Sequence, residues 1–286
     1  MLEKEKIINF KTKFLNDERL KNELSANTLK TYNNSINKFI QYLNNLSINR
    51  IDKQIMINYK NYLNEISGSS KTKNLWITVI NKYLKYLNCK ELCLKKIKVQ
   101  NKFYLKNVLT LADYKRLLRI AKRENMIQDY MIIQTLAKTG IRISELKYFT
   151  VDNLKKSNRN IIMISSKGKE RDIEIPTKLG TDLRKYAREN KLDGYIFTQI
   201  NNKNKLLNPS TFWKHLQKIA GIARVNKDKC HAHNFRHLFS IEFLKEHNNN
   251  SFALASLLGH SSLNTTRIYQ TFSPDEKRAM LDKMRL

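Results

Sequence analysis

Residues 160–176 read NIIMISSKGKERDIEIP, and this stretch decides the class of fold. Residues 161–165 form one strand-like run of mostly apolar residues, and in the second run, residues 171–175, polar and apolar residues alternate from residue 172 on. The Ser-Lys-Gly-Lys sequence between the two runs is typical of a tight turn, because Gly168 tolerates backbone angles that other residues avoid. The pattern predicts an antiparallel two-stranded hairpin, with Lys167 and Lys169 at its tip.

Apolar residues at helical spacing flank this hairpin on both sides. Upstream, the run TLADYKRLLRIAKRE begins a helix for which Thr110 or Asp113 is a candidate N-cap. Further helices are predicted over residues 129–138, 177–189, 209–220, 233–245 and 251–258. Residues 108–286 are therefore expected to form a mostly helical domain that carries a small antiparallel β-sheet.

The first hundred residues contain apolar stripes at i, i+3, i+4 and i+7 spacing. These stripes predict helices over residues 7–15, 29–43, 55–66 and 75–87. Ser25 to Thr28 supply N-cap candidates for the second helix, and Ser69 or Ser70 supplies one for the fourth. Residues 1–95 are expected to be a small helical-bundle domain. Residues 96–107 are basic and weakly periodic, and we expect them to link this domain to the second one. Because both domains are predicted to be mostly helical, the expected fold class is mainly α.

The charge of the chain points to a polyanionic partner. Lys and Arg number 54 against 25 Asp and Glu, which gives a formal net charge of +29. Nucleic acid is the first candidate for that partner. An acidic membrane surface is the rival, but the sequence shows neither an amphipathic anchor nor an apolar run of about 18 residues. We expect a soluble protein of the bacterial cytoplasm, associated with the nucleoid, without a membrane partner.

The three cysteines provide no disulfide framework, which suits a reducing compartment. Cys89, Cys93 and Cys230 could be combined with His231 as zinc ligands, but their spacing is not C-x-x-C and no finger pattern surrounds them. The sequence also has no G-x-x-x-x-G-K-[ST] motif and no carboxylate cluster placed for two metals. We therefore predict no cofactor and no metal.

Phosphodiester chemistry without a metal needs a nucleophile, cationic groups for the phosphate oxygens, and an acid for the leaving alkoxide. The segment TGIRISEL places Arg142 after a glycine, with Glu145 three residues later to hold its guanidinium. The hairpin tip offers Lys167 or Lys169 as the acid. Taken alone, each of these residues also fits an ordinary solvated surface.

The segment HAHNFRHLFS, residues 231–240, places His233 and Arg236 at i and i+3 of a predicted helix, so both side chains face one way. Such a pair suits a phosphate clamp and a proton shuttle, with His231 and His237 as rivals for the histidine role. The later segment LLGHSSLNTTRIYQ, residues 257–270, places Tyr269 nine residues after His260.

In their order, these segments resemble the tyrosine recombinase (phage integrase) family, closest in layout to its Xer-like and transposon-type members. The resemblance implies that Tyr269 is the nucleophile and that Arg142 and Arg236 bind the scissile phosphate. It also implies that Lys167 protonates the leaving 5′ oxygen, that His233 handles the proton of the tyrosine and that His260 hydrogen-bonds the phosphate. A shift of the hairpin by one residue would give the role of Lys167 to Lys169.

The resemblance further implies a site-specific recombinase that works through a 3′-phosphotyrosyl intermediate. Its partner would be a double-stranded DNA core site with inverted half-sites, bound by a homotetramer. Residues 1–95 would be the core-DNA-binding domain, and residues 108–286 the catalytic domain ending in an exchange helix that docks in cis or in trans. The alternative function is nicking and rejoining by a relaxase-like or topoisomerase-like enzyme with the same tyrosine chemistry. A non-catalytic DNA-binding protein on a decayed recombinase fold is a third hypothesis.

Overall fold

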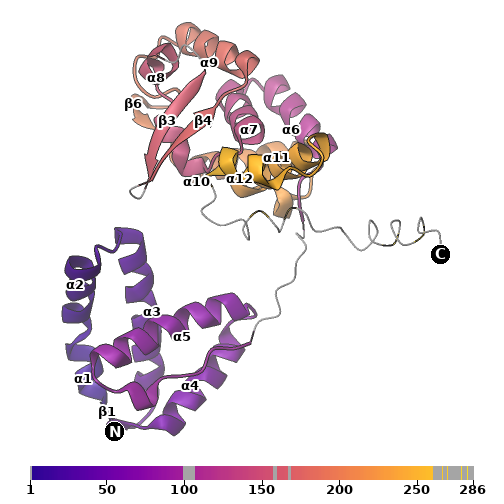
Figure 1. Ribbon diagram of the computed structural model, residues 1–286. Helices are drawn as coiled ribbons and strands as arrows, with labels where there is room; N and C mark the ends of the chain where they lie inside the picture. The colour runs from indigo at the N-terminus through magenta and orange to yellow at the C-terminus, as the bar shows by residue number, and fades with distance from the viewer. Residues whose placement is uncertain are drawn as a thin grey trace. The chain divides into compact units, whose positions relative to one another are not determined.

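The chain folds into two compact units, Met1–Asn101 and Lys102–Leu286. The computed structural model describes residues 2–98, 107–156, 160–166 and 169–259, and the single residues 266, 269, 278 and 282. Each unit surrounds its own buried apolar core, and Figure 1 shows both as mainly helical. The predicted fold class is therefore confirmed.

The N-terminal unit is a helical bundle whose helices begin at polar caps. Ser25, Asp52 and Ser69 each accept a hydrogen bond from a backbone N–H in the first turn of the helix that follows. The apolar stripe predicted as a single helix over residues 7–15 is divided, because the backbone turns at Phe10. The helices are α1 (Lys4–Asn9), α2 (Lys11–Asn22), α3 (Ala26–Asn44), α4 (Lys53–Ile66), α5 (Ser70–Tyr86) and the short 3-10 helix η1 (Lys90–Leu92).

Aromatic side chains dominate the core of the N-terminal unit. Phe14 lies 4.9 Å from Tyr83 between ring centroids, and Phe39 lies 4.7 Å from Tyr59. All four rings are fully buried. These contacts join α2, α3, α4 and α5, so that the amphipathic helices of the bundle close on one another.

The C-terminal unit is a helical body with two short hairpins. Thr110 and Asp113 form a reciprocal capping box at the start of its first helix, so both N-cap candidates take part. Its helices are α6 (Leu111–Arg123), α7 (Ile127–Thr139), the 3-10 helix η2 (Ile143–Tyr148), α8 (Val151–Lys156), α9 (Thr177–Glu189), α10 (Pro209–Ile222), the 3-10 helix η3 (Lys227–Lys229), α11 (Ala232–Glu246) and α12 (Ser251–Leu258).

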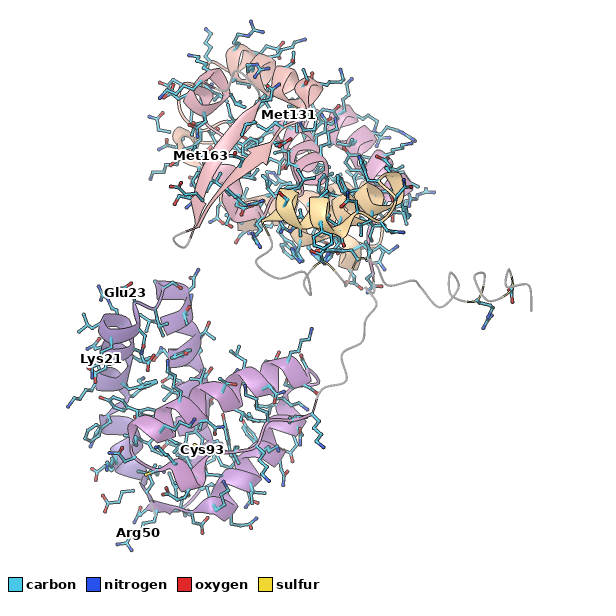
Figure 2. The ribbon with its side chains drawn as sticks, in the orientation of Figure 1. Lys21, Glu23, Arg50, Cys93, Met131 and Met163 are labelled. Carbon is cyan, nitrogen blue, oxygen red and sulfur yellow. The ribbon has the colours of Figure 1, made fainter. Side chains whose placement is uncertain are left out.

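The predicted hairpin is present as β3 (Ile161–Ser166) and β4 (Lys169–Glu174), paired antiparallel. Side chains alternate between its two faces, as strand geometry requires. Ile162 and Ile164 on one face are 2% and 1% exposed, whereas Met163 on the opposite face is 68% exposed and lies on the outside of the sheet in Figure 2. The buried face anchors the hairpin to the helical body.

Two further strand pairs were not predicted. In the N-terminal unit β1 (Leu2–Glu3) pairs with β2 (Arg50–Ile51), and in the C-terminal unit β5 (Thr198–Gln199) pairs with β6 (Asn202–Leu206). Strands of two residues are too short to show alternation, and β6 is mostly polar and exposed, so neither pair leaves a pattern in the sequence. Within the described residues, the helices are all too short or too polar to cross a membrane.

Candidate active site

Arg236 lies at the centre of the candidate site, on helix α11 and 1% exposed. Its Nη1 donates a hydrogen bond to the Gly140 carbonyl oxygen at 2.7 Å, and its Nη2 donates to the Leu258 carbonyl oxygen at 3.0 Å. These carbonyls come from the C-terminal ends of α7 and α12, so one guanidinium joins three helices. Burial and the positive charge of Arg142 lower the pKa of Arg236 to about 10, and the group stays charged at neutral pH.

Two glycines with left-handed backbone angles allow the ends of α7 and α12 to pack closely against their neighbours. Gly140 ends α7 with a φ of 62°, and Gly259 ends α12 with a φ of 61°. A Cβ on Gly140 would lie 2.5 Å from Phe239 Cδ1, and a Cβ on Gly259 would lie 2.3 Å from Arg171 Cδ. Glycine is therefore needed at both positions for its backbone angles and for space.

Arg142 and Glu145 lie together at the start of η2, within the predicted TGIRISEL segment. Glu145 Oε1 is 3.2 Å from Arg142 Nη1, and Glu145 Oε2 accepts the Arg142 backbone N–H at 2.8 Å. Burial opposes ionisation of Glu145, but this N–H and the charge of Arg171 outweigh it and hold the pKa of the carboxyl below its usual value. The Arg142 side chain is 48% exposed, so its guanidinium is open to a ligand from outside.

Tyr269 is buried against helix α11. It is 8% exposed and packs on Leu244, Leu254 and Leu258. Its hydroxyl lies 3.2 Å from Nδ1 of His237, which is also 8% exposed. Burial, followed by the positive charge that nearby His233 can carry, lowers the pKa of His237 to about 4, so its ring is neutral at neutral pH.

His233, the histidine favoured by the sequence, lies next to this pair and is exposed. Its ring contacts that of His237 edge to face, with 4.4 Å between the centroids. His231, the other rival, is exposed at the N-terminal end of α11. The hydroxyl of Tyr269 thus meets His237, a candidate that the sequence offered only as an alternative.

Two of the predicted residues, Lys167 and His260, lie outside the described residues, as does most of the predicted C-terminal helix. Lys169 begins β4 opposite Ser166. No cluster of three or more His, Cys, Asp or Glu side chains that could hold a metal ion occurs in the described part of the chain.

The sequence-based prediction omitted Arg171. This residue donates from Nη2 to Glu145 Oε2 at 2.7 Å and from Nη1 to the Leu257 carbonyl oxygen at 2.9 Å. A signal was available, because residues 171, 173 and 175 share one face of the strand and the other two are isoleucines. A charge on an apolar strand face indicates a paired, functional or structural cation.

Comparison with known proteins identifies the family. The phage integrase family matches residues 107–276, and the phage integrase N-terminal SAM-like domain matches residues 12–91. The chain belongs to the phage integrase family. It is a tyrosine-type site-specific recombinase, an enzyme that cleaves and rejoins DNA strands.

Several relatives resemble this phage integrase family member over most of its length. "Tyrosine recombinase XerA" of Pyrococcus furiosus is 29% identical over 223 residues, which cover 76% of each chain. The structure of XerH site-specific recombinase bound to difH substrate in a pre-cleavage complex has a TM-score of 0.71 at 18% identity, covering 96% of this chain and 84% of that one. A lambda integrase tetramer bound to a Holliday junction has a TM-score of 0.74 at 14% identity, covering 96% and 80%. The two structures share the fold of this integrase.

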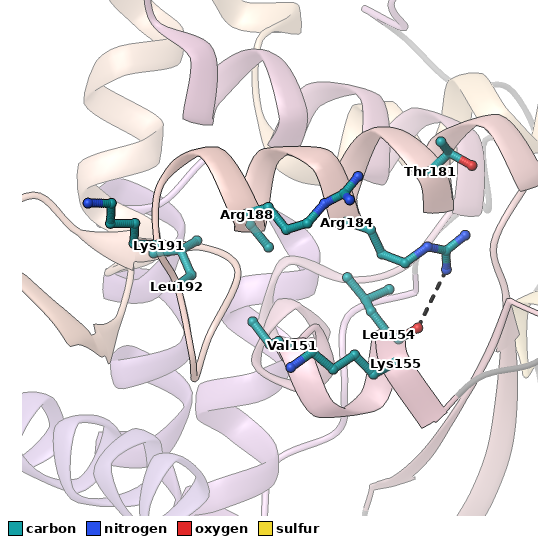
Figure 3. Close-up of a pocket in the computed structure, with 9 residues that line it drawn as sticks. Val151, Leu154, Lys155, Thr181, Arg184, Arg188, Lys191 and Leu192 are labelled. Carbon is teal, nitrogen blue, oxygen red and sulfur yellow. Dashed lines mark hydrogen bonds between the residues drawn. The ribbon is translucent and has the colours of Figure 1, made fainter.

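The integrase also has a cavity of about 400 Å³ between α8 and α9. Arg184 crosses one end of it toward the Leu154 carbonyl oxygen, and Lys155, Arg188 and Lys191 line the rest with apolar side chains (Figure 3). The described candidate residues of the active site do not line this cavity. The cavity is therefore separate from the candidate active site around α11 and η2.

Proposed function

We propose that this recombinase cleaves DNA by attack of the Tyr269 hydroxyl on the scissile phosphate. The observation that carries the proposal is the 3.2 Å contact between that hydroxyl and His237 Nδ1, one residue along α11 from the buried Arg236. A phenol with an ordinary pKa of about 10 is a weak nucleophile unless a base accepts its proton. His237 is unprotonated at neutral pH and can accept this proton, although the burial that keeps it neutral also makes it a weaker base than an ordinary histidine.

In the proposed reaction one bond to phosphorus forms as another breaks, and each proton has a donor and an acceptor. The Tyr269 oxygen forms a bond to phosphorus while the bond from phosphorus to the 5′ oxygen breaks, which leaves a 3′-phosphotyrosyl ester. The phenol proton passes to the histidine pair, where His237 accepts it and the exposed His233 ring lies beside it. Lys167 supplies a proton to the leaving 5′ oxygen, with Lys169 as the alternative. Attack by a 5′-hydroxyl of the partner strand reverses the step without an external energy source.

Cationic groups would stabilise the charge on the phosphate in the transition state. Arg142 is exposed and held in place by Glu145, and Arg236 is held by two backbone carbonyls. Guanidinium groups fixed in this way need little reorganisation during the reaction. His260 joins them by the family resemblance.

The remaining assignments concern the assembly. We assign residues 1–95 to a core-DNA-binding domain, residues 96–107 to a linker and residues 108–286 to the catalytic domain with its exchange helix. The substrate would be a double-stranded core site with inverted half-sites, bound by a tetramer in the bacterial cytoplasm. Support comes from the net charge of +29, from XerH bound to difH and from the lambda integrase tetramer on a Holliday junction.

A nicked suicide substrate tests the proposed chemistry. The flanking DNA of the gene is first searched for inverted repeats, and the probe is a duplex that carries such a site, nicked next to the expected cleavage position so that the short product strand diffuses away. We expect wild-type protein to form a covalent adduct with DNA that survives denaturation, and Tyr269→Phe to form none. Tyr186→Phe is the matched control, since Tyr186 is also 8% exposed in the same unit and should leave adduct formation unchanged.

Two results would refute the proposal. The first is the absence of an adduct with wild-type protein on a duplex that it binds. The second is an adduct that persists in Tyr269→Phe. Relaxation of supercoiled DNA without site preference would instead favour the relaxase-like or topoisomerase-like alternative.

A further inference from the structure

Arg171 is a charged residue on the buried face of the β3–β4 hairpin, and no role proposed above uses it. Its side chain is 16% exposed. Its cross-strand partner Ile164 is 1% exposed, and Ile173 on the same face of β4 is 2% exposed. A guanidinium on such a face loses its hydration, which is unfavourable unless the charge is paired and hydrogen-bonded.

The two ends of the Arg171 guanidinium bind different elements. Nη2 donates to Glu145 Oε2 on η2 at 2.7 Å, and Nη1 donates to the Leu257 carbonyl oxygen near the end of α12 at 2.9 Å. Its Cδ and Nε fill the space that a side chain on Gly259 would need. Arg171 therefore connects the hairpin to η2 and to the last turn of α12.

Glu145 is shared between two arginines. Its Oε1 pairs with Arg142, and its Oε2 accepts from both the Arg142 backbone and Arg171. Two guanidinium charges and one carboxylate leave a formal charge of +1 on the cluster. If Glu145 paired with Arg142 alone, the pair would be neutral and would attract a phosphate less strongly. Arg171 thus offsets the carboxylate that orients Arg142.

We propose that Arg171 is a positioning residue, which shares the Glu145 carboxylate and ties the hairpin to α12, so that Arg142 is fixed and the cluster keeps a net positive charge for contact with the phosphate. The inference rests on the proposed function, because it assigns the phosphate contact to Arg142. Arg171 itself need not touch the DNA. It acts through Arg142, the residue proposed to contact the phosphate.

The first test compares Arg171→Gln, Arg171→Lys and wild type in single-turnover cleavage of the nicked duplex at saturating protein. We expect Arg171→Gln to lower the cleavage rate by about 100-fold, because the Arg142 guanidinium loses its fixed position and the cluster loses its net positive charge. Arg171→Lys keeps the charge and one hydrogen bond, and we expect it to cleave about tenfold faster than Arg171→Gln. The Kd for the intact duplex should change by less than about threefold, since the surface cations that dominate binding remain.

A double-mutant cycle separates positioning from a general loss of structure. If Arg171 acts through Arg142, adding Arg171→Gln to Arg142→Lys should slow cleavage by no more than about threefold beyond Arg142→Lys alone. Multiplicative effects of the two changes would overturn the inference, and so would a cleavage rate of Arg171→Gln within about threefold of wild type. If Arg171→Gln does not fold, the same cycle with Arg171→Lys decides the question.

Arg184→Gln is the matched control. Arg184 is also a partly buried arginine of the C-terminal unit, and it donates to Asn160 Oδ1 at 2.9 Å and to the Leu154 carbonyl oxygen, away from the active-site cluster. It should cleave at the wild-type rate. A wild-type protein that forms no adduct refutes the proposed function, whereas a normal wild type with a fully active Arg171→Gln refutes only the role of Arg171.

Discussion

Both units of the chain bury aromatic rings, but they differ in how completely they bury charged side chains: Glu18 and Lys73 of the N-terminal unit keep 7% and 9% exposure. The N-terminal unit closes over aromatic rings, among them Phe14, Phe39 and Tyr83, which are fully buried. The C-terminal unit buries Arg236 and Glu145, at 1% and 4% exposure. Apolar burial stabilises a fold directly, whereas burial of a charge is unfavourable until fixed partners compensate it. The difference is that the deepest charges of the chain, Arg236 and Glu145, lie in the C-terminal unit, where fixed hydrogen-bond partners compensate them.

The largest expected effect tests the buried charge in the C-terminal unit. Arg236→Lys keeps the charge but cannot donate to both the Gly140 and Leu258 carbonyl oxygens while facing a phosphate. We expect single-turnover cleavage to fall by about 100-fold to 1000-fold. Arg50→Lys, at the exposed residue of strand β2 in the N-terminal unit, should cleave at the wild-type rate. Equal cleavage rates for wild type and Arg236→Lys would mean that the buried charge of the C-terminal unit has no role in cleavage.

The second prediction concerns the buried histidine. Folding lowers the pKa of His237 from its usual 6.5 to about 4, so the unfolded chain binds this proton more readily than the folded one. The stability of the folded state that depends on a neutral His237 is therefore complete above about pH 6.5 and is lost as the pH falls from about 6.5 to about 4. We expect the free energy of unfolding of the C-terminal unit to fall on the order of 2–3 kcal/mol more in wild type than in His237→Gln across this window.

The chain provides a reporter for this measurement. Its two tryptophans are Trp76 in the N-terminal unit and Trp213 in the C-terminal unit, so Trp76→Phe leaves a fluorescence signal from the second unit alone. Urea unfolding at several pH values then gives the free energy. His247→Gln, at the exposed end of α11, is the control and should keep the wild-type pH dependence. The prediction fails if His237→Gln also keeps the wild-type pH dependence.

Elements with local sequence signals were predicted most accurately. Helices α9 and α12 were predicted with their observed bounds because Pro176 and Gly259 mark where one begins and the other ends. The hairpin was predicted to within two residues, because two short apolar-rich runs on either side of a turn sequence indicate paired strands. Local signals of this kind depend only on neighbours in the chain.

The active-site contacts depend on residues far apart in the chain, and they were predicted less completely. The proximity of Arg142 and Glu145 followed from their i, i+3 spacing, but Arg171 binds Glu145 from 26 residues away and His237 meets Tyr269 from 32 residues away. No periodicity reports such pairs. The sequence could mark Arg171 as a charge on an apolar strand face and His237 as a candidate, but their partners Glu145 and Tyr269 became known only from the fold.

The third prediction measures a polar contact within the aromatic core. Tyr83 donates from its hydroxyl to the Ile7 carbonyl oxygen at 2.5 Å, joining α5 to α1. Tyr83→Phe removes this hydrogen bond and keeps the ring, and we expect it to lower the free energy of unfolding of the N-terminal unit by about 1 kcal/mol. Urea unfolding of a Trp213→Phe background, followed by Trp76 fluorescence, gives this value. No change would mean that the hydroxyl adds nothing to the core.

The smallest effect is expected at Tyr59, which forms a matched pair with Tyr83. Both are fully buried, but among the described residues the Tyr59 hydroxyl has no hydrogen-bond partner. Tyr59→Phe keeps the contacts with Phe39, Tyr42 and Tyr62 and removes a buried polar group, so the free energy of unfolding should stay unchanged or rise by up to about 1 kcal/mol. The same Trp76 signal measures it. If Tyr59→Phe were as destabilising as Tyr83→Phe, the N-terminal core would depend on polar contacts too, and the contrast with the charged C-terminal site would be one of degree.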